Sequence, residues 1–332
     1  MSESKAKYAL HRAIKDGDIE KVKHLINNDT TLVNSKYKDG ITALSVALKY
    51  KNLPIAKVLL NNGADINAKN NSGHTALHTA LHMSIIPDGG NYNGKNIADS
   101  VGILIQHGTN NPSVNDDINA IIKFLIKNGA NTNVKDNVDQ TPLHCTANSF
   151  INNLDIVQLL LDHDADPNMQ NVHGLTPLHL VVDTIQVCCG FFEKYPPYFN
   201  DHIALLLKYN ADINIEDNQG NTPLSDAVRS KCIEPLEIML KHNSTSINKK
   251  YDEGETLLHI AVRCQRTDVI QLLIDYGADI DAEDDDDMTP INYADEIGNT
   301  DVFTLLTQNN RFNGLSFQQT ANMSILKKEK LI

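Results

Sequence analysis

The chain has 332 residues, 41% of them hydrophobic and 5% aromatic, with no tryptophan and a formal net charge of −13. A surface this acidic repels phosphate backbones, so it argues against general nucleic-acid binding and favours a basic protein partner. No stretch approaches the ~18 consecutive apolar residues of a membrane-spanning helix, and residues 1–7 contain no apolar run. Neither a membrane span nor a signal peptide is therefore expected.

The first part of the chain, residues 5–38, predicts two short amphipathic helices. Ala9, Leu10, Ala13 and Ile14 recur at helical spacing, and a second apolar set follows from Ile19. Lysines interleave with both sets, as expected for the solvated outer face of a capping unit at the end of a repeat array. The remainder of the chain supplies such an array.

A phrase that begins with threonine occurs seven times in the chain, and the steps between its copies are 33, 66, 35, 46, 34 and 33 residues. Each copy precedes a short apolar segment and then a second one that closes on a phrase such as Gly-Ala-Asp-Ile-Asn. The seven copies are Thr42-Ala-Leu-Ser, Thr75-Ala-Leu-His, Thr141-Pro-Leu-His, Thr176-Pro-Leu-His, Thr222-Pro-Leu-Ser, Thr256-Leu-Leu-His and Thr289-Pro-Ile-Asn.

The stretch Gly254–Asp286 shows how one such unit is built. Thr256 is expected to cap a first helix, and Thr267-Asp268 a second one. The second helix has a one-sided apolar face that includes Leu273, and Gly277 is expected to end it in the left-handed conformation. Two helices this short cannot bury their apolar faces alone, so each unit requires a neighbour of the same kind.

The period near 33 residues, with its Thr-Pro-Leu-His and Gly-Ala-Asp-Ile-Asn phrases, resembles the ankyrin repeat over roughly residues 5–310. The resemblance implies an all-α solenoid of helix-turn-helix repeats, each with a β-turn finger, an inner helix and an outer helix. The expected segments are an N-terminal capping repeat 1–38, repeats 39–71, 72–137, 138–171, 172–218, 219–252 and 253–285, a C-terminal capping repeat 286–310, and a polar tail 311–332.

Two of these repeats are longer than the period and are expected to carry insertions. In the first, residues 84–117 separate an inner-helix phrase from the outer helix that begins near Ile118. An inserted lobe and a decayed repeat that kept only its outer helix both fit, and the loop residues on both sides favour the lobe. The second insertion, residues 186–200, is rich in aromatic residues.

The histidines of the repeated phrase do not predict a metal site. They are His78, His144, His179 and His259, one in each of four repeats, whereas metal ligands must converge. In the family that the chain resembles, this histidine supports the turn by hydrogen bonding. The five cysteines, Cys145, Cys188, Cys189, Cys232 and Cys264, show neither a disulfide framework nor a zinc spacing, which suits a reducing compartment.

A glycine-rich stretch at residues 89–96 matches the spacing of a phosphate-binding loop. Gly89, Gly94 and Lys95 occupy the positions that such a loop needs. However, Asn96 stands where Ser or Thr would hold magnesium, and no buried strand precedes the stretch. A surface loop is the favoured interpretation, with nucleotide binding as the alternative.

Two segments are candidates for binding a protein partner. One is an acidic run at a finger, made of Glu283, Asp284, Asp285, Asp286 and Asp287. It lacks the central glycine of a calcium-binding loop. It could instead form a docking edge for a basic partner, or a solvated fingertip. The aromatic residues of the second insertion could form a hot spot or a cover over the chain's own repeats. They are Phe191, Phe192, Tyr195, Tyr198 and Phe199.

These observations together predict a non-catalytic protein-binding scaffold or adaptor, since no nucleophile, base and anion hole assemble. We expect a monomer without cofactor or metal, indifferent to chelators and reductants, in the cytoplasm or in the cytosol or nucleus of a host. Composition and family resemblance suggest a host-directed protein of an intracellular bacterium or a large DNA virus. The alternatives are a nucleotide-dependent or enzymatic switch that uses the 84–117 insertion, and a subunit of a larger complex.

Overall fold

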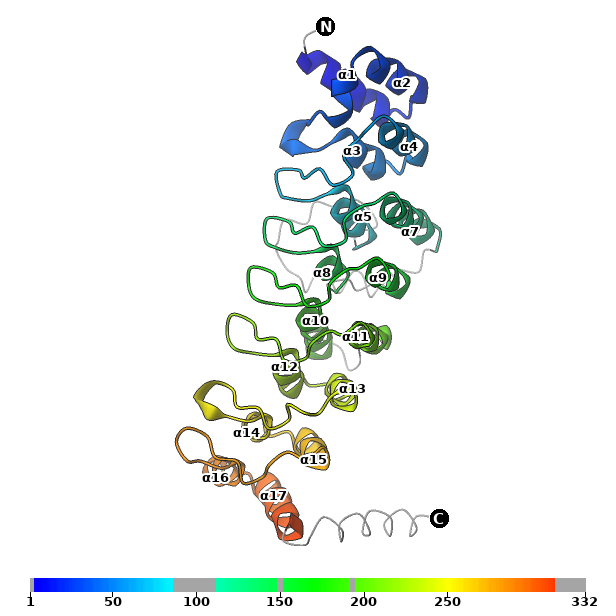
Figure 1. Ribbon diagram of the computed structural model, residues 1–332. Helices are drawn as coiled ribbons and strands as arrows, with labels where there is room; N and C mark the ends of the chain where they lie inside the picture. Colours follow the sequence, from blue (N-terminus) through cyan, green and yellow to red (C-terminus); the bar gives the residue numbers. More distant parts are fainter. Residues whose placement is uncertain (1–2, 86–111, 148–151, 192–194, 314–332) are drawn as a thin grey trace. The chain divides into compact units, whose positions relative to one another are not determined.

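The computed structural model describes residues 3–85, 112–147, 152–191 and 195–313, and these residues form pairs of α-helices joined by loops (Figure 1). Within those ranges there is no β-strand, and an isolated antiparallel bridge joins Lys36 to Thr42. The all-α architecture of helix pairs agrees with the expected fold class. No helix among the described residues is long and apolar enough to cross a membrane.

The chain divides into two compact units: residues 1–181 with 208–211, and residues 182–207 with 212–332. The helices of the first unit are α1 (Glu3–Lys15), α2 (Ile19–Asn28), η1 (Thr30–Asn34), η2 (Lys38–Gly40), α3 (Ala43–Lys49), α4 (Leu53–Asn61), α5 (Ala76–Ile85), α7 (Pro112–Lys127), α8 (Pro142–Ala147) and α9 (Leu154–Leu161).

Two helices contribute residues to both units, and the others of the second unit lie C-terminal to them. The shared helices are α10 (Pro177–Phe191) and α11 (Tyr198–Lys208). The remaining helices are α12 (Pro223–Arg229), α13 (Glu234–His242), η3 (Asp252–Gly254), α14 (Leu257–Arg263), α15 (Thr267–Asp275), α16 (Pro290–Ile297) and α17 (Thr300–Asn313).

The repeated threonine phrase fixes where the inner helices begin. Thr42 precedes α3 and accepts a hydrogen bond from the backbone N–H of Ser45, and Thr222 forms a reciprocal capping box with Ser225. Where proline follows the threonine, it is the first helical residue, a position that needs no N–H partner. Gly277 follows the last turn of α15 with a φ of 92°, as predicted.

The predicted cap at Thr267-Asp268 is wrong by one residue. The capping position belongs to Arg266, and Thr267 is the first residue of α15. The Arg266 guanidinium donates to both carboxylate oxygens of Asp268, at 2.9 and 2.7 Å, so the residue at the capping position pairs with an acidic side chain of the first turn.

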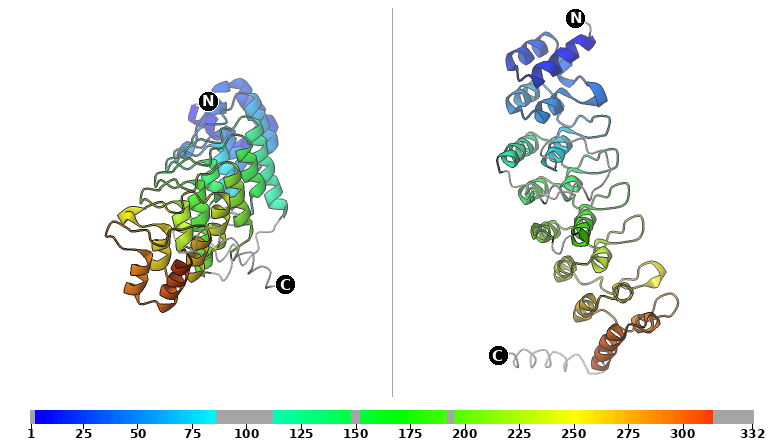
Figure 2. Two further views of the ribbon diagram at one scale, coloured as in Figure 1. Left: turned by 60° about the horizontal axis from the view of Figure 1, so that its bottom comes forward. Right: turned by 180° about the vertical axis from the view of Figure 1, so that it is seen from behind.

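Within each unit, inner helices pack against their own outer helix and against neighbouring inner helices. In the first unit α3 contacts α1, α4 and α5, and in the second α14 contacts α12, α15 and α16. Within each unit the inner helices lie between the fingers and the outer helices, as Figure 2 also shows from behind. Fully buried leucines, such as Leu48 in α3 and Leu273 in α15, fill the space between the layers.

Both long repeats have an inner helix and an outer helix. α5 and α7, which flank residues 86–111, pack against each other as an inner and an outer helix. In the other long repeat, α10 continues to Phe191, and α11 begins at Tyr198. Much of the predicted 186–200 loop is therefore helical, because Cys188 continues the buried face of α10 and Phe199 that of α11.

Candidate protein-binding surfaces

In five of the fingers, an aspartate or asparagine five residues before the threonine of the repeated phrase builds the turn. Its side-chain oxygen accepts backbone N–H groups two and four residues ahead, which closes the turn. In the finger before α8, Asp136 accepts from Val138 at 2.9 Å and from Gln140 at 2.8 Å. Asn70, Asn171, Asp217 and Asp284 form the same pair of bonds.

Four pairs of neighbouring fingers are joined by one backbone hydrogen bond each. The N–H of Asn71 donates to Asp39 at 3.0 Å, that of Asn137 to Ser72 at 3.1 Å, and that of Asp285 to Glu253 at 3.1 Å. Glycine is needed at these contacts: a Cβ on Gly254 would lie 2.7 Å from the backbone nitrogen of Asp285. The Asn137–Ser72 bond pairs the fingers that precede α5 and α8, although 65 residues separate its partners.

The histidines of the repeated phrase are structural, as the resemblance implied. His144 is fully buried; its Nδ1 accepts from the Thr141 N–H at 3.2 Å, and its Nε2 donates to the Leu175 carbonyl of the next finger at 3.0 Å. His78 and His259 bond in the same way to Gln140 and Met288. Each of these histidines therefore ties its helix start to the following finger. Among the described residues no group of three or more His, Cys, Asp or Glu could hold a metal ion.

Burial of the His78 and His144 imidazoles opposes their protonation. Desolvation lowers the pKa of His78 and of His144 to about 4, although each Nε2 bonds to a backbone carbonyl. Desolvation also lowers the pKa of the buried His202 in α11 to about 4. These side chains are neutral at pH 7 and are not available as general acids in that range.

Two adjacent fingers of the second unit present exposed carboxylates. Asp252 and Glu253 lie on one, and Asp285, Asp286 and Asp287 on the next. Glu283 is exposed beside them. Asp284 is different, because it is buried and accepts from the Tyr293 hydroxyl at 2.7 Å as well as from two backbone N–H groups. Of the predicted acidic run, Asp284 builds the finger and the other four side chains face solvent.

Sequence analysis missed a second group of carboxylates, on the inner helices of the same unit. Burial raises the pKa of Asp226 in α12 to about 7, and the nearby charge of Asp183 in α10 raises it further, while Arg229 opposes the effect from 3.6 Å. Burial and Asp217 likewise raise the pKa of Asp183. The signal available in the sequence was weak, since 43 residues separate Asp183 from Asp226.

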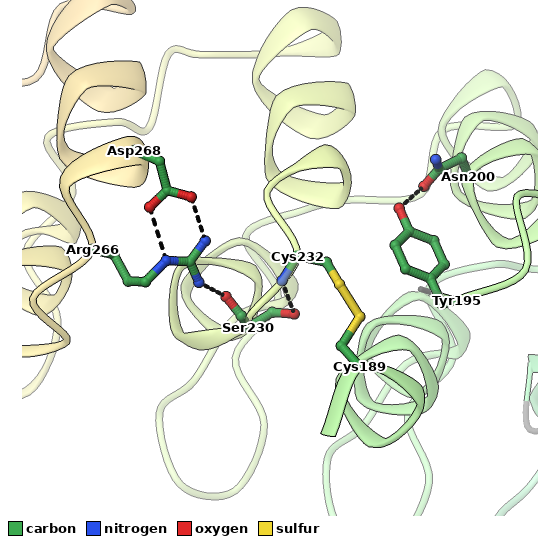
Figure 3. Close-up of a disulfide and its surroundings, with 7 residues drawn as sticks. All are labelled: Cys189, Tyr195, Asn200, Ser230, Cys232, Arg266 and Asp268. Carbon is green, nitrogen blue, oxygen red and sulfur yellow. Dashed lines mark hydrogen bonds and ion pairs between the residues drawn. A yellow bond between two sulfur atoms is a disulfide. The ribbon is translucent and has the colours of Figure 1, made fainter. Parts of the chain in front are cut away.

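The aromatic residues that the structure describes are partly or wholly buried within the chain. Phe199 is 0% exposed, and its ring lies 4.8 Å from that of the half-buried Tyr198. The Tyr195 hydroxyl donates to Asn200 at 2.6 Å (Figure 3), and burial together with Glu234 raises the pKa of Tyr195 to about 12. Phe192 lies outside the described residues, and Phe191 is described only as the last residue of α10.

A disulfide between Cys189 and Cys232 corrects the expectation that the cysteines are unpaired. It joins the C-terminal turn of α10 to the segment that precedes α13, across 43 residues of sequence (Figure 3). The pair could not be predicted from the spacing of the cysteines in sequence, because the two residues come close only when the repeats pack and the longer α10 reaches that segment. Because of this bond, we now expect the stability of this part of the fold to depend on reductants.

The other candidate residues show no reactive arrangement among those described. The sulfur of Cys145 lies 3.5 Å from His82 Nε2 of α5. Burial raises the pKa of the Cys145 thiol to about 12, so it is a thiol and not a nucleophilic thiolate at neutral pH. Gly89, Gly94 and Lys95, which carry the nucleotide-binding alternative, lie outside the described residues.

Comparison with known proteins agrees with this geometry. The family described as ankyrin repeats matches residues 10–112, 113–189 and 236–316. The chain is 29% identical over 191 residues to ankyrin repeat protein L371 of Acanthamoeba polyphaga mimivirus, covering 52% of this chain and 23% of that protein. It is 31% identical over 188 residues to ankyrin repeat protein FPV031 of fowlpox virus, covering 53% of this chain and 45% of that protein.

A match outside viruses is ZDHHC13 of Danio rerio, which is named as a palmitoyltransferase; the identity is 28% over 174 residues, 52% of this chain and 21% of that protein. The matched region thus spans less than half of each of these relatives. Because the family matches most of the sequence and the helix pairs and fingers have the expected form, the chain belongs to the ankyrin repeat family.

Proposed function

We propose that this protein is a non-catalytic scaffold or adaptor and that the acidic fingers of its second unit bind a basic segment of a protein partner. The observation that carries the proposal is the pair of adjacent fingers, linked by the Asp285–Glu253 backbone bond, whose tips carry five exposed carboxylates. The buried Asp284 side chain and the Asp285–Glu253 bond hold the second of these fingers, so its charges are presented with little ordering cost on binding.

The carboxylates of α10 and α12 support the same proposal. A pKa of about 7 at Asp226 means that its charged form lacks sufficient compensation within the protein. A lysine or arginine of a partner that approached Asp226 and Asp183 would stabilise their ionised forms, and binding would release protons near neutral pH. The protein therefore offers a basic segment both exposed carboxylates and partly buried ones.

Ankyrin repeats are protein-interaction modules in general, and the viral relatives motivate the finer proposal of a host-directed adaptor that acts in the cytoplasm or nucleus of a host cell. The buried Phe199 and the hydrogen-bonded Tyr195 support a covering role for the aromatic segment over its own repeats. We accordingly assign partner binding to Glu283, Asp285, Asp286 and Asp287, and propose that the aromatic residues contribute mainly to stability.

The test uses a lysine- and arginine-rich peptide as a probe and a triple variant, Asp285→Asn, Asp286→Asn and Asp287→Asn. The matched control removes three exposed carboxylates of the same unit from its outer helices: Asp201→Asn, Asp275→Asn and Asp301→Asn. We expect the fingertip variant to slow association and flatten its salt dependence, with binding weakened about tenfold, while the control changes little. Equal losses in both variants would show non-specific attraction and overturn the proposal.

A further inference from the structure

A basic and aromatic hollow in the first unit lies at the finger that precedes α3. It is lined by Ser4, Lys7 and Tyr8 of α1 and by Lys36, Tyr37 and Lys38 of the finger. Tyr8 is 56% exposed and Tyr37 40%. Residues 1–75 carry twelve Lys and Arg against seven Asp and Glu, in a chain whose formal net charge is −13. This region therefore has the opposite charge to the acidic fingers.

The Tyr37 side chain cannot accept the two backbone N–H groups that an Asx side chain accepts in other fingers. Five residues before the threonine, other fingers have the Asx side chain that closes the turn, whereas here and at Tyr251 a tyrosine takes that place. The Tyr251 hydroxyl contacts Thr222 of the preceding repeat at 3.1 Å. For Tyr37 the corresponding residue is Tyr8, whose ring lies 6.3 Å away and tilted by 46°, and neither hydroxyl has a hydrogen-bond partner among the described residues.

The ring of Tyr37 is nevertheless held in place, because it stacks on the buried His11 with ring centroids 4.6 Å apart. The two tyrosines thus form a fixed aromatic surface that contacts within the protein leave exposed to solvent. Rigid aromatic rings with available hydroxyls are typical of binding hot spots, since little side-chain entropy is lost when a partner covers them.

The backbone of the same finger offers one more group. In the neighbouring fingers the N–H of Asn71, Asn137 or Val172 donates to the finger before it. The equivalent group is the N–H of Lys38, and no described residue accepts it. Beside it lie the exposed ammonium group of Lys38 and that of Lys36, which donates to the Lys69 carbonyl at 2.8 Å. A backbone donor, lysine cations and an aromatic surface therefore face the same hollow.

We propose that this hollow binds a short extended acidic segment of a partner protein, whose backbone carbonyl accepts from Lys38 N–H. Its carboxylates would meet Lys7, Lys36 and Lys38, and its chain would lie across Tyr8 and Tyr37. The bond to Lys38 repeats the one that already joins neighbouring fingers, so it needs no new backbone geometry. This surface is separate from the acidic fingers, and the inference goes beyond the proposed function by assigning a second partner chemistry.

The test combines anisotropy and NMR with a fluorescein-labelled peptide of glutamate and glycine and its glutamine counterpart. We expect saturable binding of the glutamate peptide only, and a loss of about tenfold or more in the double variant Tyr37→Ala with Lys38→Gln. The matched control, Tyr50→Ala with Lys21→Gln, removes an exposed tyrosine and an exposed lysine elsewhere in the unit and should retain binding. In amide spectra the Lys38 N–H should shift more than those of Asn71 and Asn137.

The inference would be overturned by a lack of saturable binding, or by equal losses of affinity in the two double variants. It would also be overturned if the Lys38 amide were already protected from exchange in the free protein, or if a single-stranded oligonucleotide of equal charge displaced the peptide. The last outcome would assign the hollow to nucleic acid. Binding of the basic peptide to the acidic fingers is measured in parallel. If it persists while the glutamate peptide fails to bind, only the present inference falls.

Discussion

At the scale of single residues, the same chemistry is used repeatedly to fix the backbone. A threonine caps the inner helix, a histidine joins that cap to the next finger, and an aspartate or asparagine closes the finger. Because His144 receives the Thr141 N–H and donates to the Leu175 carbonyl, it must be neutral to hold both bonds. The pH dependence of stability should therefore report on these histidines.

We expect the protein to lose stability as the pH falls from about 6.5 to about 4. The pKa of His78 and of His144 is about 4 in the folded protein, below the ordinary value near 6.5, so the unfolded chain binds more protons in this window. Urea unfolding at several pH values should show it. His144→Gln should cost about 1–3 kcal/mol at pH 7 and have a shallower pH dependence. A variant as steep as the wild type would contradict this account.

Asp226 should have the opposite dependence. Its pKa of about 7 lies above the ordinary value near 3.9, so the folded protein binds the additional proton, and stability is lost as the pH rises from about 4 through about 7. Asp226→Asn should raise the melting temperature at pH 8 and have little effect at pH 4. Asp201→Asn, a change on an exposed position of α11, is the control. A variant destabilised at pH 8 would show that the charge is compensated after all.

At the scale of elements, α10 departs most from the repeat pattern. It has 15 residues, whereas α12 and α14 have seven each, and its last turn is tied to the segment before α13 by the Cys189–Cys232 disulfide. The bond closes a loop of 43 residues in sequence. A cross-link of that length constrains the unfolded chain and holds two neighbouring repeats together.

Reduction of this bond should lower stability by about 2–4 kcal/mol, in the second unit. Thermal unfolding with and without dithiothreitol measures the change, and Cys232→Ser should be as stable as the reduced wild type and no longer respond to reductant. Cys264→Ser, at an exposed free cysteine, is the control. If reductant lowers the stability of Cys232→Ser as well, another cysteine pair is responsible.

At the scale of the whole molecule, stability should be local, because in a repeat array each unit is stabilised by its own packing and by that with its nearest neighbours. Leu59 of α4 and Leu273 of α15 are both fully buried, one in each unit. Replacing either by alanine should cost about 2–5 kcal/mol. Hydrogen exchange should then increase only in the unit that carries the substitution, and increased exchange throughout the chain would show that the two units unfold together.

The monomeric, metal-independent state stays a prediction at this scale. Sedimentation velocity should give one species near 36.8 kDa, unchanged by EDTA. A dimer that dissociates on neutralising Asp285, Asp286 and Asp287 would instead indicate that the acidic fingers of one copy bind the basic hollow of another.

The sequence by itself determined the repeat, its capping threonines and its left-handed glycines such as Gly277, and the resemblance to the ankyrin repeat implied the structural role of His78, His144 and His259. All of these depend on interactions within one repeat or with the next, and such local interactions leave a periodic signature. The finger-building position of Asp284, five residues before Thr289, is equally periodic but was not predicted, because Asp284 lies within a run of carboxylates that is typical of a solvated surface.

Only the tertiary structure decided the rest. The Cys189–Cys232 bond, the pairing of Asp183 with Asp226, and the burial of Phe199 each depend on where the longer α10 and α11 place side chains that are far apart in sequence. The hollow at Tyr8 and Tyr37 likewise arises where α1 meets a finger 29 residues later. Contacts of this kind have no fixed sequence spacing, because they arise where the chain departs from its own repeat.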